Sequence, residues 1–274
     1  MAVAYGENTV EVNGLELYYR EYGCGERSGE PLLLIMGLGG NADWWNPLLL
    51  ELLSQRFHVV TFDNRGAGRS GKPPGPYSIA QMADDAAGLM ERLGWASAHV
   101  LGMSMGGMIA QELALRHPDR ARKLVLLVTA CGGREHVPPG QEVLKMLLPE
   151  KGMSLERMAE ITLKLLFPQS FIDANPGAAE EMKRAVLGAP IPTRCFLAQL
   201  NAIATWSAFP RLKDIRQETL IITGTEDILV PPENSRILAR EIPNSRLLEF
   251  PGGGHGLIGQ FPREVAEEVV AFLS

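Results

Sequence analysis

Short apolar runs alternate with helical stretches along most of this 274-residue chain. Continuous runs of apolar residues, or of residues that favour strands, predict strands buried on both faces. Apolar residues at helical spacing, ending at glycine or proline, predict helices. Strands that alternate with helices form βαβ units, so the sequence predicts an α/β fold with a mostly parallel central sheet flanked by helices. The predicted strands are 31–36, 57–63, 98–102, 123–129, 219–223 and 245–250, and the predicted helices are 77–93, 105–117, 232–241 and 263–273. An alternating segment, 9–22, turns at Asn13-Gly14 and predicts an antiparallel hairpin at the edge of the sheet.

The alternation stops between Cys131 and Pro210, where no strand pattern is found. Four helical stretches separated by proline and glycine take its place, at 141–148, 155–167, 178–187 and 193–206. The length of the chain suits one large α/β domain with an added lobe. We therefore predict a core made of residues 1–130 and 211–274, with residues 131–210 inserted as a helical cap.

Composition excludes several classes of protein. The 26 basic and 32 acidic residues give a net charge of −6, without a basic run or tail, so the sequence does not indicate a nucleic-acid partner. The apolar runs are too short to cross a membrane, and the N-terminus does not resemble a signal peptide. The spacing of Cys24, Cys131 and Cys195 argues against a disulfide framework and a CxxC metal site. These features predict a cytoplasmic protein in a reducing compartment, and they leave its oligomeric state open.

A tight turn, Gly102-Met103-Ser104-Met105-Gly106, lies between a predicted strand and a predicted helix. This strand–turn–helix arrangement presents a serine oxygen at the end of a sheet, on a backbone that small neighbours allow to bend sharply. The amides at the start of the helix also favour developing negative charge. The sequence therefore predicts Ser104 as a nucleophile. The alternative is that Ser104 only caps the helix.

A serine nucleophile needs a base, and the base needs an acid that orients it. Asp227 and Glu226 both follow the strand at 219–223, and Asp227 is the preferred acid. His255 follows the strand at 245–250 on a glycine-rich loop, and it is the only histidine after the acid. The remaining histidines occupy strand starts, a helix end and the predicted cap, where structural roles suffice. They are His58, His99, His117 and His136. We predict a catalytic triad of Ser104, Asp227 and His255.

These motifs resemble the α/β-hydrolase superfamily over nearly the whole chain. The matching stretches are IMGLGGNADWW (35–45), FDNRGAGRSGKP (62–73), LGMSMGGMIAQELALRHPDR (101–120), TGTEDILVPP (223–232) and PGGGHG (251–256). The chain looks most like the cap-bearing group that includes carboxylesterases, enol-lactonases, acyl-homoserine lactonases and cofactor-free haloperoxidases. This resemblance implies the α/β-hydrolase fold and the order Ser, acid, His along the chain.

The resemblance also implies an oxyanion hole formed by the backbone N–H groups of Leu38 and Met105. Many relatives carry His-Gly where this chain has Met36-Gly37. The N–H of Leu38 does not depend on that histidine, but the support of its loop is left open. Relatives that open epoxides or remove halide carry aspartate at the position of Ser104, so those activities are not expected. Asp63 and Arg65 are interpreted as structural.

The predicted reaction is hydrolysis of carboxylic esters or lactones with small to medium acyl groups through an acyl-enzyme on Ser104. It requires no metal and no organic cofactor, and its partner is a small-molecule substrate. We expect a pocket between core and cap, lined by Leu38, Trp44, Met105, Met146, Phe167, Trp206 and Leu229; ordinary core packing is the alternative for each. The same triad could also serve perhydrolysis, C–C bond hydrolysis or acyl transfer to an alcohol. A hydrolase-fold receptor without turnover is the alternative from another class of protein.

Overall fold

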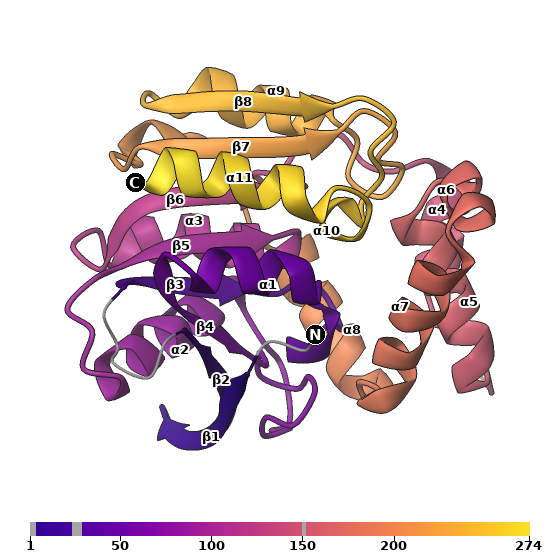
Figure 1. The fold of residues 1–274 in the computed structure, drawn as a ribbon, viewed down its shortest axis with the longest axis horizontal. Coiled ribbons are helices and arrows are strands. Elements are labelled where there is room, and N and C mark those ends of the chain that lie inside the picture. Colours follow the sequence, from indigo (N-terminus) through magenta and orange to yellow (C-terminus); the bar gives the residue numbers. More distant parts are fainter. Residues whose placement is uncertain (1–3, 24–28, 150–151) are drawn as a thin grey trace.

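The computed structural model describes residues 4–23, 29–149 and 152–274. Within them, eight strands form one sheet in the order β1-β2-β4-β3-β5-β6-β7-β8 (Figure 1). Strands β3 to β8 are parallel, and β1 and β2 form an antiparallel hairpin that joins the sheet through β4. The strands are β1 Tyr5–Val12, β2 Leu15–Tyr22, β3 Glu30–Ile35, β4 Phe57–Phe62, β5 Ala98–Met103, β6 Ala121–Leu127, β7 Thr219–Gly224 and β8 Ser245–Phe250. The predicted α/β fold and its edge hairpin are confirmed.

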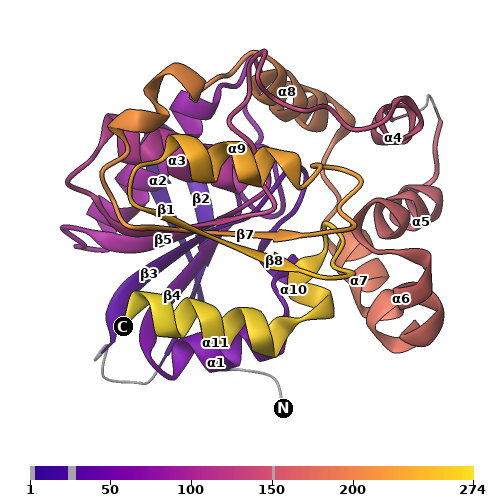
Figure 2. The same cartoon turned by 90° about the horizontal axis from the view of Figure 1, so that it is seen from above.

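Helices cover both faces of the sheet. The helices α1 (Pro47–Ser54) and α11 (Pro262–Leu273) lie on one face, and α2 (Ile79–Arg92), α3 (Met105–Arg116) and α9 (Glu233–Glu241) lie on the other (Figure 2). Side chains of β3 alternate between the two layers, because successive residues of a strand point to opposite faces. Leu32 and Leu34 belong to one hydrophobic cluster and Leu33 and Ile35 to the other, and all four are fully buried. Burial on both faces explains why this strand has a continuous apolar sequence.

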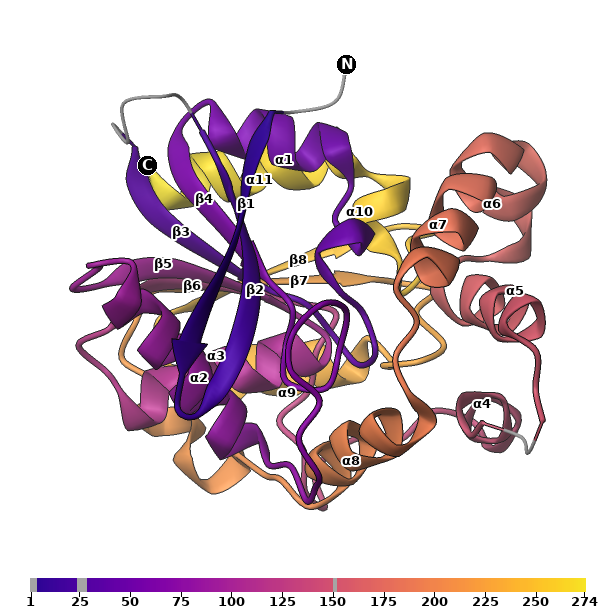
Figure 3. The same ribbon diagram turned by 90° about the horizontal axis from the view of Figure 1, so that it is seen from below.

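Five α-helices lie between β6 and β7 in the described chain, and we call them the helical insertion. They are α4 Gln141–Leu147, α5 Leu155–Leu166, α6 Gln169–Ala174, α7 Pro176–Gly188 and α8 Thr193–Ala204. They lie beyond the carboxyl ends of the parallel strands, with α8 nearer to the core than α5 and α6 (Figures 1 and 3). The two ends of the insertion meet, since the N–H of Ala208 donates to the carbonyl of Cys131 at 2.8 Å and Gly132 bridges to Ser207. This contact lies close to the limits 131–210 that we propose for the cap.

Three short helices complete the described chain: η1 Ala42–Trp44, η2 Phe209–Asp214 and α10 Leu257–Gln260. Cys131 and Cys195 are buried free thiols, while Cys24 lies outside the described residues. In the part of the chain that the structure describes, no helix has the length and apolar character needed to cross a membrane.

Candidate active site

Ser104 occupies a sharp turn between β5 and α3. Its backbone has φ 56° and ψ −121°, a strained conformation for a residue other than glycine. The turn is held by its own backbone: the N–H of Ser104 donates to Leu127 at 2.8 Å, and its carbonyl accepts from the hydroxyl of Thr129 at 2.7 Å. The serine side chain makes no capping hydrogen bond to α3. Ser104 thus holds the N-cap position of α3 but does not cap the helix through its side chain, so the capping alternative is not supported by a side-chain bond.

Two glycines allow this turn to form. A Cβ added to Gly102 would overlap the carbonyl of Gly106, and a Cβ added to Gly106 would overlap the carbonyl of Ile35. Both obstacles are backbone atoms, which cannot rotate out of the way as a side chain can. The turn therefore requires glycine on each side of the nucleophile.

Gly106→Ala is expected to destabilise the fold by about 3 kcal/mol or more, because strand β3 must shift to admit the methyl group. Gly177→Ala is the matched control, since Gly177 also lies in a helix but a Cβ there meets no atom within 4 Å. The control should change the free energy of unfolding by no more than about 1 kcal/mol. Urea unfolding of both variants measures the difference. Equal stability of the two variants would contradict this account of the turn.

Asp227 and His255 form a buried pair at the ends of β7 and β8. The Nδ1 atom of His255 lies 2.8 Å from Oδ2 of Asp227, and the two side chains are 3% and 0% exposed. The other carboxylate oxygen accepts the backbone N–H groups of Leu229 and Val230 at 2.9 and 2.8 Å. An ionised carboxylate can only accept, so Nδ1 donates and Nε2 is left as an acceptor. Glu226, the alternative acid, is exposed.

The loop that carries His255 rests against the helical insertion. The N–H of Gly256 donates to the carbonyl of Leu166 at 2.6 Å. The ring of Phe167 packs so closely against Gly256 and Gly259 that neither position has room for a Cβ. Phe167 also stacks on Phe171, with ring centroids 5.1 Å apart. Phe167 was expected to bind substrate, but the structure instead gives it a role in supporting the histidine loop.

The loop that follows β3, residues 36–41, lies beside the nucleophile, and we call it the β3 loop. A Cβ placed on Gly37 would lie 3.0 Å from Cβ and 3.5 Å from Oγ of Ser104. The N–H of Leu38 makes no hydrogen bond within the described residues. Met105 occupies the first position of α3, where a backbone N–H has no acceptor within the helix. Both predicted oxyanion donors are thus free beside Ser104.

Three polar side chains hold the β3 loop and the helix η1 after it: Asp63 and Asn64 from the loop after β4, and Gln199 from α8. The amide of Asn64 donates to the carbonyl of Met36 at 2.8 Å, and Gln199 accepts the N–H of Gly39 at 2.9 Å. Asp63 accepts the N–H of Ala42 at 2.7 Å. The loop is therefore well supported without the histidine that many relatives carry. The predicted structural role of Asp63 agrees with this contact, and Arg65 makes a buried two-point contact with Asp85 at 2.6 and 2.7 Å.

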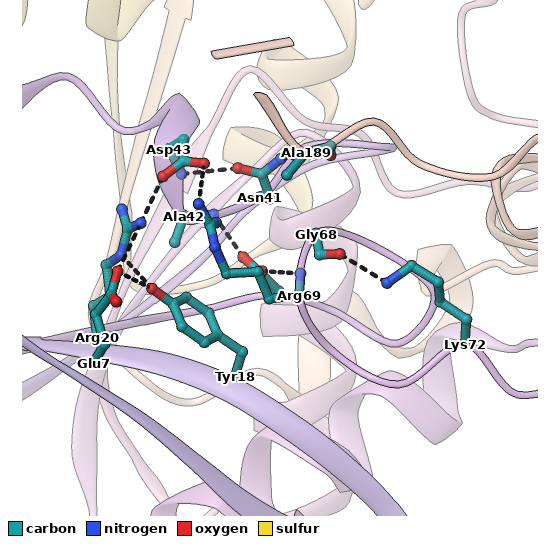
Figure 4. A network of polar contacts seen from close by, with 11 residues as sticks. Glu7, Tyr18, Arg20, Asn41, Ala42, Asp43, Gly68, Arg69, Lys72 and Ala189 are labelled. Carbon is teal, nitrogen blue, oxygen red and sulfur yellow. Dashed lines mark hydrogen bonds and ion pairs between the residues drawn. The ribbon is translucent and has the colours of Figure 1, made fainter. Parts of the chain in front are cut away.

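An ionic network anchors η1 from outside (Figure 4). Asp43 pairs with Arg20 at 2.6 Å and with Arg69 at 2.9 Å. Arg20 also donates to the hydroxyl of Tyr18, which in turn donates to Glu7. Burial raises the pKa of Tyr18 to about 12, and the bond to Glu7 adds to this shift, so the phenol stays protonated as a donor. The network fixes the helix that carries Trp44.

Ser104 and His255 open into one cavity between the core and the helical insertion. Of the residues predicted to line a pocket, Leu38, Trp44, Met146 and Leu229 line this cavity. Other lining side chains from the insertion are almost all apolar, and they include Met153, Met158, Ile161, Leu165, Val186, Ile191 and Phe196. No Lys, Arg, Asp, Glu, Asn or Gln contributes to the lining within the described residues. The site is therefore suited to an apolar group next to a serine nucleophile.

Trp206 lies away from this cavity, and its predicted role in substrate binding is not supported. Its indole N–H donates to Glu112 at 2.8 Å, and Arg211 pairs with the same carboxylate. Burial raises the pKa of Glu112, but the hydrogen bonds from Arg211 and Trp206 outweigh it and hold the pKa below its usual value. Trp206 thus fastens the end of the insertion to α3. The side chain of Met105 is fully buried in the core and does not line the cavity.

The turn, the buried pair and the sheet agree with comparisons to known proteins. A family model described as "alpha/beta hydrolase fold" matches residues 30–262, which is most of the chain. The chain belongs to the alpha/beta hydrolase family. It is therefore a hydrolase, and the resemblance predicted from its motifs is confirmed.

Relatives of this alpha/beta hydrolase carry more than one activity in their names. A protein of Caulobacter segnis named "Putative carbamate hydrolase RutD" is 36% identical over 93% of this chain and 95% of its own length. The solved enol-lactonase of Burkholderia xenovorans LB400 has a TM-score of 0.87 at 28% identity, covering 97% of this chain and 99% of that one. A thermophilic esterase of Thermogutta terrifontis has a TM-score of 0.81 at 28% identity, with 98% coverage of both chains.

Proposed function

We propose that this protein is a serine hydrolase that cleaves carboxylic esters or lactones with an apolar acyl group. One observation carries the proposal: a strained, partly exposed serine and a buried Asp227–His255 pair meet at the same apolar cavity. A binding protein without turnover has no use for an ordered His–Asp pair beside such a serine. The names of the lactonase and esterase neighbours support the same substrate class.

The proposed mechanism assigns one role to each group. Nε2 of His255 takes the proton of Ser104, whose oxygen attacks the substrate carbonyl, and Asp227 stabilises the imidazolium that forms. The N–H groups of Leu38 and Met105 bind the developing oxyanion. The backbone N–H groups at the N-terminus of α3 also stabilise its negative charge. His255 then protonates the leaving alcohol. Water hydrolyses the acyl-enzyme by the same steps, with His255 as the base.

Carbamate is the second candidate, because several relatives are named as carbamate hydrolases. The carbamate ion is small and anionic, and its tight binding calls for a cationic or polar partner. Within residues 4–23, 29–149 and 152–274 the cavity lining contains no Lys, Arg, Asn or Gln side chain, and its hydroxyl groups other than that of Ser104 belong to Thr162 and Thr193. The lining therefore favours an apolar acyl group over the carbamate ion.

A substrate panel tests the proposed function. It contains p-nitrophenyl butyrate, an acyl-homoserine lactone, ammonium carbamate, a substrate with a cleavable C–C bond and peroxide as an alternative acceptor. We expect the ester or the lactone to give the highest kcat/KM, and ammonia release from carbamate to stay at the uncatalysed rate. A higher kcat/KM on carbamate, on the C–C substrate or in perhydrolysis would reassign the activity. No turnover on the whole panel would support a receptor.

The rate should depend on pH through the base. Only neutral imidazole accepts a proton from serine, so protonation of His255 removes activity. We expect kcat/KM for p-nitrophenyl butyrate, measured from about pH 8 to about pH 5, to fall as the pH is lowered. Circular dichroism at each pH verifies that the protein stays folded. A flat profile over this range would contradict the role of His255.

A further inference from the structure

Gln199 is a fully buried amide that connects the helical insertion to the active-site loops. It lies on α8, where its carbonyl oxygen accepts the N–H of Gly39 at 2.9 Å. Its NH₂ group donates to the carbonyl of Arg65 at 2.9 Å, in the loop between β4 and α2. One side chain therefore ties α8 to two separate loops of the core.

The bond to Gly39 controls the peptide next to the proposed oxyanion donor. Gly39 has φ +71°, and a Cβ added to it would lie 3.3 Å from the ring of Phe196, which also lies on α8. Because a peptide unit is planar, fixing the N–H of Gly39 fixes the plane of the whole Leu38–Gly39 peptide. The N–H of Leu38 belongs to the preceding peptide and is joined to this plane through the φ and ψ angles of Leu38, so anchoring Gly39 restricts the directions that this N–H can take. With the Gly39 N–H occupied by Gln199, the Leu38 N–H is the donor left beside Ser104.

A second bond joins the insertion to the same loop. The side-chain amide of Asn41 donates to the carbonyl of Ala189, between α7 and α8, at 3.1 Å (Figure 4). The other end of the Asn41 side chain accepts the N–H of Asp43 and caps η1. Asn41 is also fully buried. The β3 loop is thus held from the insertion at two points that are two residues apart.

We propose that Gln199 is a positioning residue that sets the oxyanion hole, acting through the Gly39 N–H on the Leu38 N–H. This inference rests on the proposed function, since it concerns the same serine chemistry. It means that the helical insertion contributes to the rate of the chemical step as well as to the choice of acyl group. An oxyanion donor acts mainly in the transition state, so its displacement lowers kcat more than it raises KM.

Gln199→Met tests this role, because methionine has a similar length, cannot donate to Arg65 and is only a weak acceptor for the N–H of Gly39. Gln217→Met is the matched control. Gln217 is also buried, and its side-chain amide donates to the carbonyl of Pro118 at 2.9 Å, but Gln217 lies just before the amino end of β7, the end opposite to the cavity. We expect Gln199→Met to lower kcat for p-nitrophenyl butyrate by about 10- to 100-fold, with KM within about threefold. Gln217→Met should keep the wild-type kcat. Enzyme concentrations are normalised by stoichiometric titration with a phosphonate that labels Ser104.

The affinity for a trifluoromethyl ketone is a second measurement, because the ketone forms an oxyanion when Ser104 adds to it. A purely structural role of Gln199 would leave this affinity unchanged. The affinity of the ketone should fall in Gln199→Met by the same factor as kcat.

If Gln199→Met does not fold, Asn41→Ser is used in its place, since serine can still cap η1 but loses the bond to Ala189. Its kcat should fall by about three- to tenfold at constant KM. If the folded variant keeps the wild-type kcat and ketone affinity, the positioning role is overturned but the proposed function is not. If the wild-type protein turns over no ester or lactone, both proposals are overturned.

Discussion

Ser104→Ala is expected to lower kcat for p-nitrophenyl butyrate by at least about 10⁴-fold, because it removes the atom that forms the acyl-enzyme. Folding should be kept, since alanine removes only a hydroxyl that makes no capping bond in α3. The binding of the substrate should also change little. Steady-state kinetics and thermal unfolding of the purified variant measure the two effects.

Ser97→Ala is the matched control for this substitution. Ser97 and Ser104 flank the same strand, β5, but only Ser104 lies at the carboxyl end that faces the cavity. The control should retain wild-type kcat. Activity of Ser104→Ala within tenfold of the wild type would show that another group is the nucleophile.

Asp227→Asn is expected to reduce kcat by about 10⁴-fold, because an amide no longer holds the imidazole in the tautomer that leaves Nε2 free. The buried carboxylate also stabilises the imidazolium of the transition state. Glu226→Gln changes the neighbouring acid in the same way, but that side chain is exposed, so its kcat should stay close to the wild type. Pre-steady-state kinetics of both variants give the comparison. A large loss in Glu226→Gln with little loss in Asp227→Asn would reassign the acid.

The core of the fold could be predicted because its strands are buried on both faces. A strand such as β3 then shows an uninterrupted apolar sequence that is visible without knowledge of its neighbours. Helix α1 was not predicted, although Asn46 and Pro47 give a start signal: the asparagine side chain caps the helix and proline occupies its first turn. Helix α6 has only six residues, too few to show a helical period.

The proposed triad could be predicted because each member follows a strand, and parallel strands bring their carboxyl ends to one edge. Side chains of the insertion follow no such rule. Trp206 bonds to Glu112, a residue 94 positions away, and Gln199 bonds to Gly39 across 160 positions. Neither Trp206 nor Gln199 lies in a motif. A helical pattern in the sequence shows which face of a helix is buried but not which residues that face contacts. Most cavity-lining residues of the insertion, Met146 apart, and the support of the β3 loop therefore required the three-dimensional structure.

Covalent labelling tests the central proposal most directly. The protein is treated with one equivalent of a fluorophosphonate, digested, and mapped by tandem mass spectrometry while residual esterase activity is followed. We expect a single adduct on Ser104, formed in step with the loss of activity and absent from the Ser104→Ala variant. Complete labelling at another residue, or full activity after Ser104 has been labelled, would contradict the proposal that Ser104 is the nucleophile.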